Sequence, residues 1–215
     1  GALIALDPQL KDLDLTECGF DKSSLAILDS LATAHSLVRL RLGSNKLCKV
    51  GVQMLASSIA DGTARLELVD LSAVPIKKKN VLPLLDAFGS AQSACKTIVL
   101  DEVPIPKNVG TAFSALAGTG VRALRLRGCK LSSAALADVA ALVDKSETLA
   151  FLDISCNTLS DEVAPALAAA VAKSRTLTEL DVSFCDMSPK GIKAFLEGIV
   201  PNTSLLALHV CGSRL

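Results

Sequence analysis

LVRLRLGSNKL, at residues 37–47, carries leucine at its first, fourth, sixth and eleventh positions and asparagine at its ninth. LAFLDISCNTL, at residues 149–159, repeats this arrangement with isoleucine at the sixth position. The eleven-residue pattern begins eight times, with 26 to 29 residues between successive starts, at Leu10, Leu37, Leu66, Cys95, Val121, Leu149, Leu177 and Leu205. A fixed period that runs through a whole chain predicts a solenoid of stacked repeats.

Within each repeat the pattern alternates, which is typical of a short strand. Side chains at positions four and six then point into the core, and those at positions three, five and seven point to the opposite face. The segment after each strand shows the apolar spacing of a helix, as in residues 133–145. We expect these helices to begin at Asn80, at Ser160 and at the pair Ser188–Pro189, because such residues are common at helix N-termini. The fold class is therefore an α/β solenoid, a horseshoe with parallel strands on the concave face and helices on the convex face.

The ninth position follows the strand, where the backbone turns and its polar groups need partners. An asparagine there can both donate and accept hydrogen bonds, a cysteine is a weak donor, and a valine can only pack. Asparagine stands in repeats two and six, and cysteine in repeats one, five and seven. Val74 and Val103 occupy the position in repeats three and four, each followed by proline. We therefore expect the repeats over residues 66–120 to be the least stable part of the solenoid.

Composition limits the classes of function. The chain has 215 residues, with 22 Lys plus Arg balanced by 22 Asp plus Glu, which argues against nucleic acid as the main partner. The longest apolar stretch, residues 163–172, is far shorter than the roughly 20 residues of a membrane-spanning helix. Seven cysteines without a C-x-x-C pair indicate free thiols in a reducing compartment, and hence a cytoplasmic location.

The residues at positions three, five and seven are the candidate partner-binding residues, because solenoids usually bind through their concave face. Two interpretations are compatible: the charged residues form ion pairs between neighbouring strands, or they present a charged surface to another protein. Phe151 is predicted to be exposed beside acidic residues, as an anchor for a partner would be, and Phe184 to lie near the rim. The predicted set is Arg39, Arg41, Asp70, Asp101, Arg125, Arg127, Phe151, Asp153, Glu179 and Asp181.

No motif indicates catalysis, a metal site or a cofactor. The cysteines at position nine are whole repeats apart, too far to share a metal ion. His209 and Cys211 lie two residues apart on the last strand, and only Asp181 could orient them, so we expect no catalytic pair. The run Lys77–Lys79 is either a solvated loop or a basic contact for an acidic partner or a lipid headgroup.

The segments LRLGSNKL (40–47), FLDISCNTLSDEVAPALAAAVAKSRTLTEL (151–180) and LDVSFCDMSPKGIKAFL (180–196) resemble intracellular leucine-rich repeats of the ribonuclease-inhibitor-like family. That family includes ribonuclease inhibitor, NOD-like receptors, tropomodulins, activators of the GTPase Ran and CARMIL-type actin regulators. The phrase SPKGIKAFL, followed by N-x-S-L at Asn202, is similar to CARMIL repeats. The resemblance implies a non-enzymatic module that binds another protein, within a cytoskeletal or signalling regulator. The alternative that it implies is a GTPase-activating protein of the Ran type.

Both ends of the chain break the pattern of a capped solenoid. Residues 2–7 have the sequence of a helix tail from an earlier repeat, and Leu215 occupies the eleventh position of the eighth repeat. We expect residues 1–215 to form a single leucine-rich-repeat domain of about eight repeats, as a fragment of a longer protein.

Overall fold

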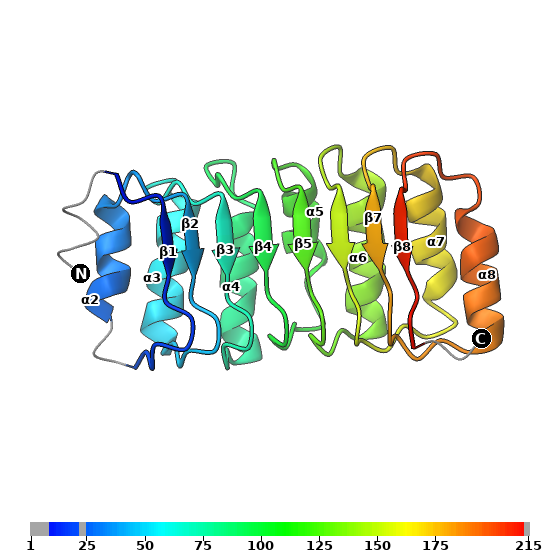
Figure 1. Ribbon diagram of the computed structural model, residues 1–215, viewed down its shortest axis with the longest axis horizontal. Helices are drawn as coiled ribbons and strands as arrows, with labels where there is room; N and C mark the ends of the chain where they lie inside the picture. Colours follow the sequence, from blue (N-terminus) through cyan, green and yellow to red (C-terminus); the bar gives the residue numbers. More distant parts are fainter. Residues whose placement is uncertain (1–8, 22–24, 213–215) are drawn as a thin grey trace.

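The computed structural model describes residues 9–21 and 25–212, and in them the chain forms one parallel sheet backed by a row of helices (Figure 1). The expected helix tail at residues 2–7 and Leu215 lie outside the described residues. The strands are β1 (Asp12–Asp14), β2 (Arg39–Arg41), β3 (Leu68–Asp70), β4 (Thr97–Val99), β5 (Ala123–Arg125), β6 (Phe151–Asp153), β7 (Glu179–Asp181) and β8 (Ala207–His209). The helices are α2 (Leu25–Asp29), continued by the 3₁₀ segment η2 (Ser30–Thr33), then α3 (Lys49–Ala60), α4 (Lys78–Phe88), α5 (Gly110–Ala117), α6 (Ser133–Lys145), α7 (Ala164–Lys173) and α8 (Pro189–Ile199).

The strands lie side by side in chain order, and each pairs in parallel with the next. Neighbouring strands are about 4.8 Å apart, whereas packed helices need about 8–10 Å, so the helix side of each repeat is wider than the strand side. This difference in width is visible in Figure 1, where the row of helices extends beyond the row of strands at both ends. The predicted α/β solenoid, with strands on the inner face of the curve, is confirmed.

Positions four and six of each strand supply the core, as the alternation predicts. Leu40 and Leu42 are buried in repeat two, and Leu152 and Ile154 in repeat six. The pairing register joins identical positions, so these side chains form two continuous rows beneath the sheet. Helix residues at helical spacing cover the rows from the other side. No helix among the described residues is long and apolar enough to cross a membrane.

Asparagine at position nine joins its own turn to the preceding repeat. The Nδ2 group of buried Asn157 donates to the carbonyl of Leu126 in the preceding repeat and to Ile154 in its own repeat, both at 2.8 Å. Its Oδ1 accepts the backbone amide of Leu131, at 3.0 Å, from position eleven of the preceding repeat. Asn45 makes the same bonds in repeat two, to Leu15 and from Phe20. One side chain therefore satisfies backbone groups in two repeats.

Cysteine at position nine uses a different turn. The thiols of Cys129 and Cys185 donate to the preceding repeat's carbonyl at position six, at 3.0 and 3.3 Å. A thiol has no counterpart to the amide oxygen, and the cysteine's own backbone carbonyl accepts the amide at position eleven of the preceding repeat, as from Leu159 to Cys185 at 2.8 Å. In these repeats the residue at position ten has a positive φ, 54° at Lys130 and 57° at Asp186. We read this as a flipped peptide between positions nine and ten, which aims the carbonyl at the neighbour.

The valine repeats have neither arrangement. The side chain of Val74 has no polar atom, and the next residue, Pro75, has a φ fixed near −65° by its ring, so the flipped peptide is not available. The amide of Ile76 donates instead to Val74 within its own turn, at 2.7 Å. Val103 is followed by Pro104 in the same way. The turn contacts at position nine are thus weakest in repeats three and four, as expected from the sequence.

Two of the three predicted helix starts are wrong. Ser188 caps α8 as expected, since its Oγ accepts the amide of Gly191 at 3.1 Å. However, α4 begins before Asn80, with Lys77 as its N-cap, and α7 begins after Ser160, with Val163 as its N-cap. Residues 161–163 form a turn ahead of Pro165, and the Ser160 hydroxyl has no hydrogen-bond partner among residues 9–21 and 25–212. Asp161 instead accepts hydrogen bonds from the amide and hydroxyl of Ser188 in the next repeat.

Asn157→Ala should lower the free energy of unfolding by about 2–4 kcal/mol, because it leaves several buried backbone groups without partners. The neighbouring Thr158 is exposed, so Thr158→Ala is the control and should change stability by less than about 0.5 kcal/mol. Asn157→Cys tests the flipped turn, since threonine at position ten resists a positive φ. Adding Thr158→Gly should recover about 1 kcal/mol in urea titrations, and no recovery would contradict the flip.

Amide exchange should be faster in residues 66–120 than in residues 121–200. Besides position nine, the loops before the later strands carry extra bonds between repeats: Thr148 Oγ1 donates to the carbonyl of Val121, and Ser204 Oγ to Leu177, at 2.8 and 2.9 Å. These bonds should hold the later repeats closed more often than the middle ones. Hydrogen exchange followed by mass spectrometry measures the difference. Equal protection across residues 37–200 would show that packing of the two valines compensates fully.

Candidate functional site

The side chains at positions three, five and seven of the eight strands form one surface, which we call the strand face. The register places position three of each strand beside position three of the next, and the same holds for position five. The surface is therefore a set of parallel rows that cross all repeats. Each predicted binding residue lies on it, but the residues differ in how exposed and how engaged they are.

At the N-terminal end, Asp12 bridges two arginines of the next strand. Its carboxylate accepts from Arg39 Nε and Arg41 Nη1, each at 2.7 Å. The hydrogen bond from Arg39, followed by that from Arg41, lowers the pKa of the Asp12 carboxyl. Asp12, at position three, was not among the predicted residues. Asp14, at position five, accepts from the amide of Thr16 at 2.9 Å.

In the middle of the strand face, Arg125 lies between two carboxylates. Its Nη2 is 2.9 Å from Asp101 Oδ2 and 3.6 Å from Asp153 Oδ2. The other oxygen of Asp101 accepts the backbone amide of Arg127 at 3.0 Å. Burial nevertheless raises the pKa of Asp101, since desolvation outweighs the bond from Arg127 and the charge of Arg125. Here the predicted ion pairs between strands do occur.

Three predicted aspartates at position five are occupied by their own strand ends. Asp70, Asp153 and Asp181 each accept the amide of the serine two residues later, at 2.8–2.9 Å. Ser155 adds its hydroxyl, at 2.6 Å, to Asp153. As a result Asp153 is only 5% exposed and does not present its carboxylate to a partner, contrary to its predicted place on an exposed surface. The spacing D-x-S was the sequence signal for this role.

An uncharged row crosses the centre of the strand face at position three. We call it the central row: Leu68, Thr97, Ala123 and Phe151. All four side chains are half-buried, and Val99, at position five, lies beside them. Phe151 is thus on the predicted face but less exposed than expected, between Ala123 on one side and Glu179 on the other. Reading position three across repeats would have identified the row from the sequence.

The later repeats form an open hollow of about 360 Å³ next to this row. Its lining includes Arg125, Arg127, Cys156, Phe184 and His209. Phe184 is 60% exposed, with its ring close to Gly212 of the next repeat. Like every described residue at position eight, it has a positive φ, here 55°, which turns the side chain away from the core. The rim position predicted for Phe184 agrees with this placement.

The polar groups of the hollow are held mainly by one another. Arg127 Nε is 3.5 Å from Cys156 Sγ. His209 Nε2 is 3.2 Å from Glu179 Oε1, so this imidazole contacts a carboxylate of the preceding strand rather than Cys211. Within residues 9–21 and 25–212, no group of three or more His, Cys, Asp or Glu side chains could hold a metal ion. This arrangement suits contact with another molecule better than proton transfer.

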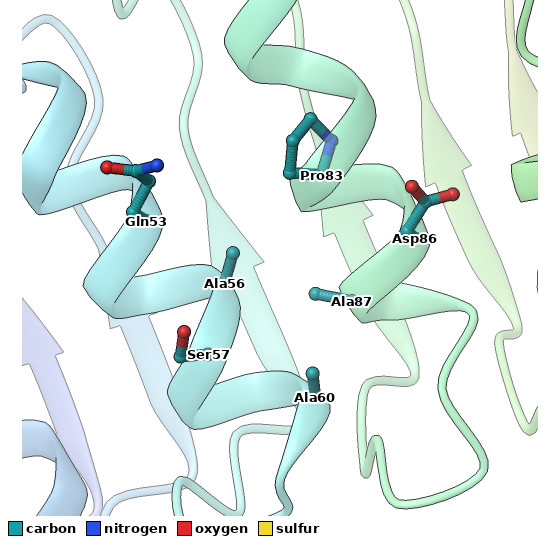
Figure 2. A pocket seen from close by; sticks show the side chains of 7 residues that line it. All are labelled: Gln53, Ala56, Ser57, Ala60, Pro83, Asp86 and Ala87. Carbon is teal, nitrogen blue, oxygen red and sulfur yellow. The ribbon is translucent and has the colours of Figure 1, made fainter.

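A second hollow lies on the helix side, between α3 and α4, as Figure 2 shows. Small side chains create it, because Ala56 and Ala60 of α3 lie opposite Pro83 and Ala87 of α4. Its polar side chains, among them Asp86, lie around these small residues. The hollow is a shallow groove between two helices and brings no reactive groups together.

Comparison with known proteins gives a consistent result. A family model described as leucine-rich repeat matches residues 145–168 and 173–196. The ribonuclease inhibitor of Sus scrofa is 25% identical over 172 residues, which cover 74% of this chain and 36% of that protein. The chain therefore spans little more than a third of this relative. Among solved structures, an internalin from Listeria monocytogenes matches with a TM-score of 0.52 at 14% identity, covering 86% of this chain and 45% of that one, which is a likeness of fold.

Replacing Arg125 should reveal how the central carboxylates are held. Arg125→Ala leaves Asp101 and Asp153 close together without their cation, and should cost about 1–2 kcal/mol of unfolding free energy after allowance for solvent screening. Arg127→Ala, which breaks no ion pair within 4 Å among the described residues, should cost less than about 0.5 kcal/mol. Chemical denaturation of both variants gives the comparison.

The double variant Arg125→Ala with Asp101→Asn separates charge from packing. If repulsion between the carboxylates causes the loss, neutralising Asp101 should restore at least half of it. An unchanged loss would show that the aliphatic stem of Arg125 matters more than its charge.

Proposed function

We propose that this chain, which matches a leucine-rich-repeat family model at residues 145–168 and 173–196 and is similar to a ribonuclease inhibitor, is a protein-interaction module whose strand face binds a partner protein. The central row is the observation that carries this proposal. It is a continuous uncharged strip on the inner face of the solenoid, whose other positions are mostly charged or polar.

The strand face has the composition of an interface, with an uncharged centre and a polar border. Four neighbouring strands at about 4.8 Å spacing make the central row about 14 Å long, before its side chains are counted. Asp101, Arg125 and Arg127 border the row on one side, and Phe184 lies beyond them at the rim of the hollow. An extended segment or a helix of a partner could cover the row and meet this border.

The predicted residues then divide by role. Arg39, Arg41, Arg127, Phe151 and Glu179 are accessible enough to contact a partner. Asp70, Asp153 and Asp181 fix the strand ends, and Asp101 and Arg125 hold each other. Most of the binding free energy should come from a few large side chains, with Phe151 first among them.

The name of the porcine relative states that it inhibits ribonuclease, which is binding of one protein by another. We propose that this chain likewise binds another protein without catalysing a reaction. We place it in the cytoplasm, where its seven free thiols would remain reduced. A place in a cytoskeletal or signalling regulator rests on the sequence resemblance alone. The Ran-type GTPase-activating alternative stays a prediction, for which the strand face offers no specific support.

Affinity capture tests the proposal with two variants that alter the strand face but not the core. Ala123→Arg places a long charged side chain in the central row, and Phe151→Ala removes its largest group. Proteins captured by the wild type should be lost with both, and a purified partner should bind Phe151→Ala about 10–30-fold more weakly.

Leu206→Ala is the matched control, because Leu206 is 86% exposed but lies outside the strand face. It should retain every partner. Circular dichroism should show that all three variants are folded. If the captured proteins are unchanged by both strand-face variants, the proposed surface is wrong.

A further inference from the structure

Seven lysines gather along one edge of the solenoid, where the strands end and the helices begin, at the bottom of Figure 1. This basic edge consists of Lys46, Lys49, Lys77, Lys78, Lys79, Lys107 and Lys130. All seven are exposed, and none takes part in an ion pair within the described part of the chain. Two carboxylates stand in the turns and first helical residues that follow β2–β5: the exposed Glu102, and Asp101, which is paired with Arg125.

The same edge is acidic elsewhere. Glu17 and Asp21 follow β1, and Asp161, Glu162 and Asp186 follow β6 and β7. The zero net charge of the whole chain therefore conceals a separation of charge along its length. A basic stretch with one exposed carboxylate should attract anions over a distance of about 8–10 Å at physiological salt.

The edge also contains a recess, of about 270 Å³, between the starts of α3 and α4. Its polar lining is Lys49, Lys77, Lys79 and Asn80, and apolar side chains, among them Leu47, Val52, Pro75 and Ile76, complete it. The N-cap residues of both helices, Cys48 and Lys77, make no side-chain cap hydrogen bond, in contrast to the serine caps of α6 and α8. Unbonded amides and the helix dipole make such ends favourable for negative charge. Here two of them adjoin a recess lined by three lysines.

We propose that the basic edge binds an acidic segment of a protein partner, with one carboxylate or phosphate group in the recess between α3 and α4. The lysines follow the edge from repeat two to repeat five, so the ligand is elongated. Three repeat spacings amount to about 14 Å at the strands and up to about 30 Å at the helices. An extended segment of about five to nine residues covers that length.

A protein segment fits this edge better than a membrane surface. Peripheral membrane proteins usually combine basic residues with apolar side chains that enter the lipid. Of the exposed large apolar side chains in the described residues, Phe184, Val200 and Leu206 lie in repeats seven and eight, and only Val50 lies near the lysines. Apart from the apolar part of the recess lining, the edge therefore offers charge and hydrogen-bond donors, with few large apolar side chains that protrude.

This site is separate from the strand face, since none of its residues lies at positions three, five or seven. Failure of one proposal therefore leaves the other standing. The edge variant is Lys49→Gln with Lys77→Gln and Lys79→Gln. The control variant is Lys145→Gln with Lys173→Gln and Lys193→Gln, which changes the net charge equally at exposed positions away from the edge.

The probe is a fluorescent peptide of about eight residues, alternating glutamate and serine, with a second version phosphorylated on its serines. Fluorescence anisotropy at low salt should show binding of one or both versions to the wild type, weakened at least about tenfold by the edge variant and less than about twofold by the control. Equal weakening by both variants, or no binding of either peptide to the wild type, would overturn the proposal. Circular dichroism confirms the fold of each variant.

Two further measurements locate the contact and exclude a membrane. Peptide addition should shift the amide NMR signals of Lys49–Gly51 and Lys78–Asn80, the first turns of α3 and α4; shifts confined to other residues would contradict the recess. Sedimentation with phosphatidylcholine vesicles, with and without phosphatidylinositol bisphosphate, is the other measurement. Vesicle binding that depends on the three lysines, with no binding of either peptide, would assign the edge to lipid instead.

Discussion

In repeats two, five, six and seven, the asparagine or cysteine at position nine accepts the backbone amide at position eleven of the preceding repeat. Leu131 donates to the side chain of Asn157, whereas Leu159 donates to the backbone carbonyl of Cys185. Both bonds connect neighbouring turns at the same place, so asparagine and cysteine at position nine are compatible with the same strand spacing and register. Because burying an amide without a partner costs about 1–3 kcal/mol, repeats must stack in order, and the sheet follows from that stacking.

The strand face inherits its geometry from this stacking. Identical positions stand beside one another, so a property repeated at one position becomes a row, as in the central row, and opposite charges at nearby positions become a pair, as in Asp101 with Arg125. The D-x-S spacing then removes some charges from the surface. Asp153 shows the effect, since its carboxylate serves Ser155 and Arg125 from a buried place. What remains for a partner is an uncharged strip with a few accessible arginines beside it.

The period and the alternation were enough to predict the sheet, its strand positions and the face on which each side chain lies, because both depend on repeated spacing. Features that depend on a single turn were harder. Ser160 has the sequence of a helix cap, yet Pro165 and the inter-repeat role of Asp161 favour a later start of α7. The positive φ of Lys130 has no signal in that residue itself, since it goes with the cysteine before it and the amide that this cysteine accepts, whereas an aspartate such as Asp186 adopts a positive φ more readily. The prediction that Asp153 is exposed was wrong, because its burial depends on hydrogen bonds from the nearby Ser155 and not on the repeat period.

The prolines of repeats three and four act in two opposing ways. Pro75 and Pro104 prevent the flipped turn, so these repeats depend on the packing of Val74 and Val103, which are buried and can supply roughly 1.5–3 kcal/mol each. The same rings restrict the loops in which Lys77 and Lys107 stand, and a restricted loop loses less entropy when a ligand orders it. The part of the solenoid with the fewest bonds at position nine is thus also the part whose surface loops are best prepared to bind. In repeats three and four, the buried valines stabilise the inner side of each turn, and the outer side carries exposed lysines such as Lys77 and Lys107.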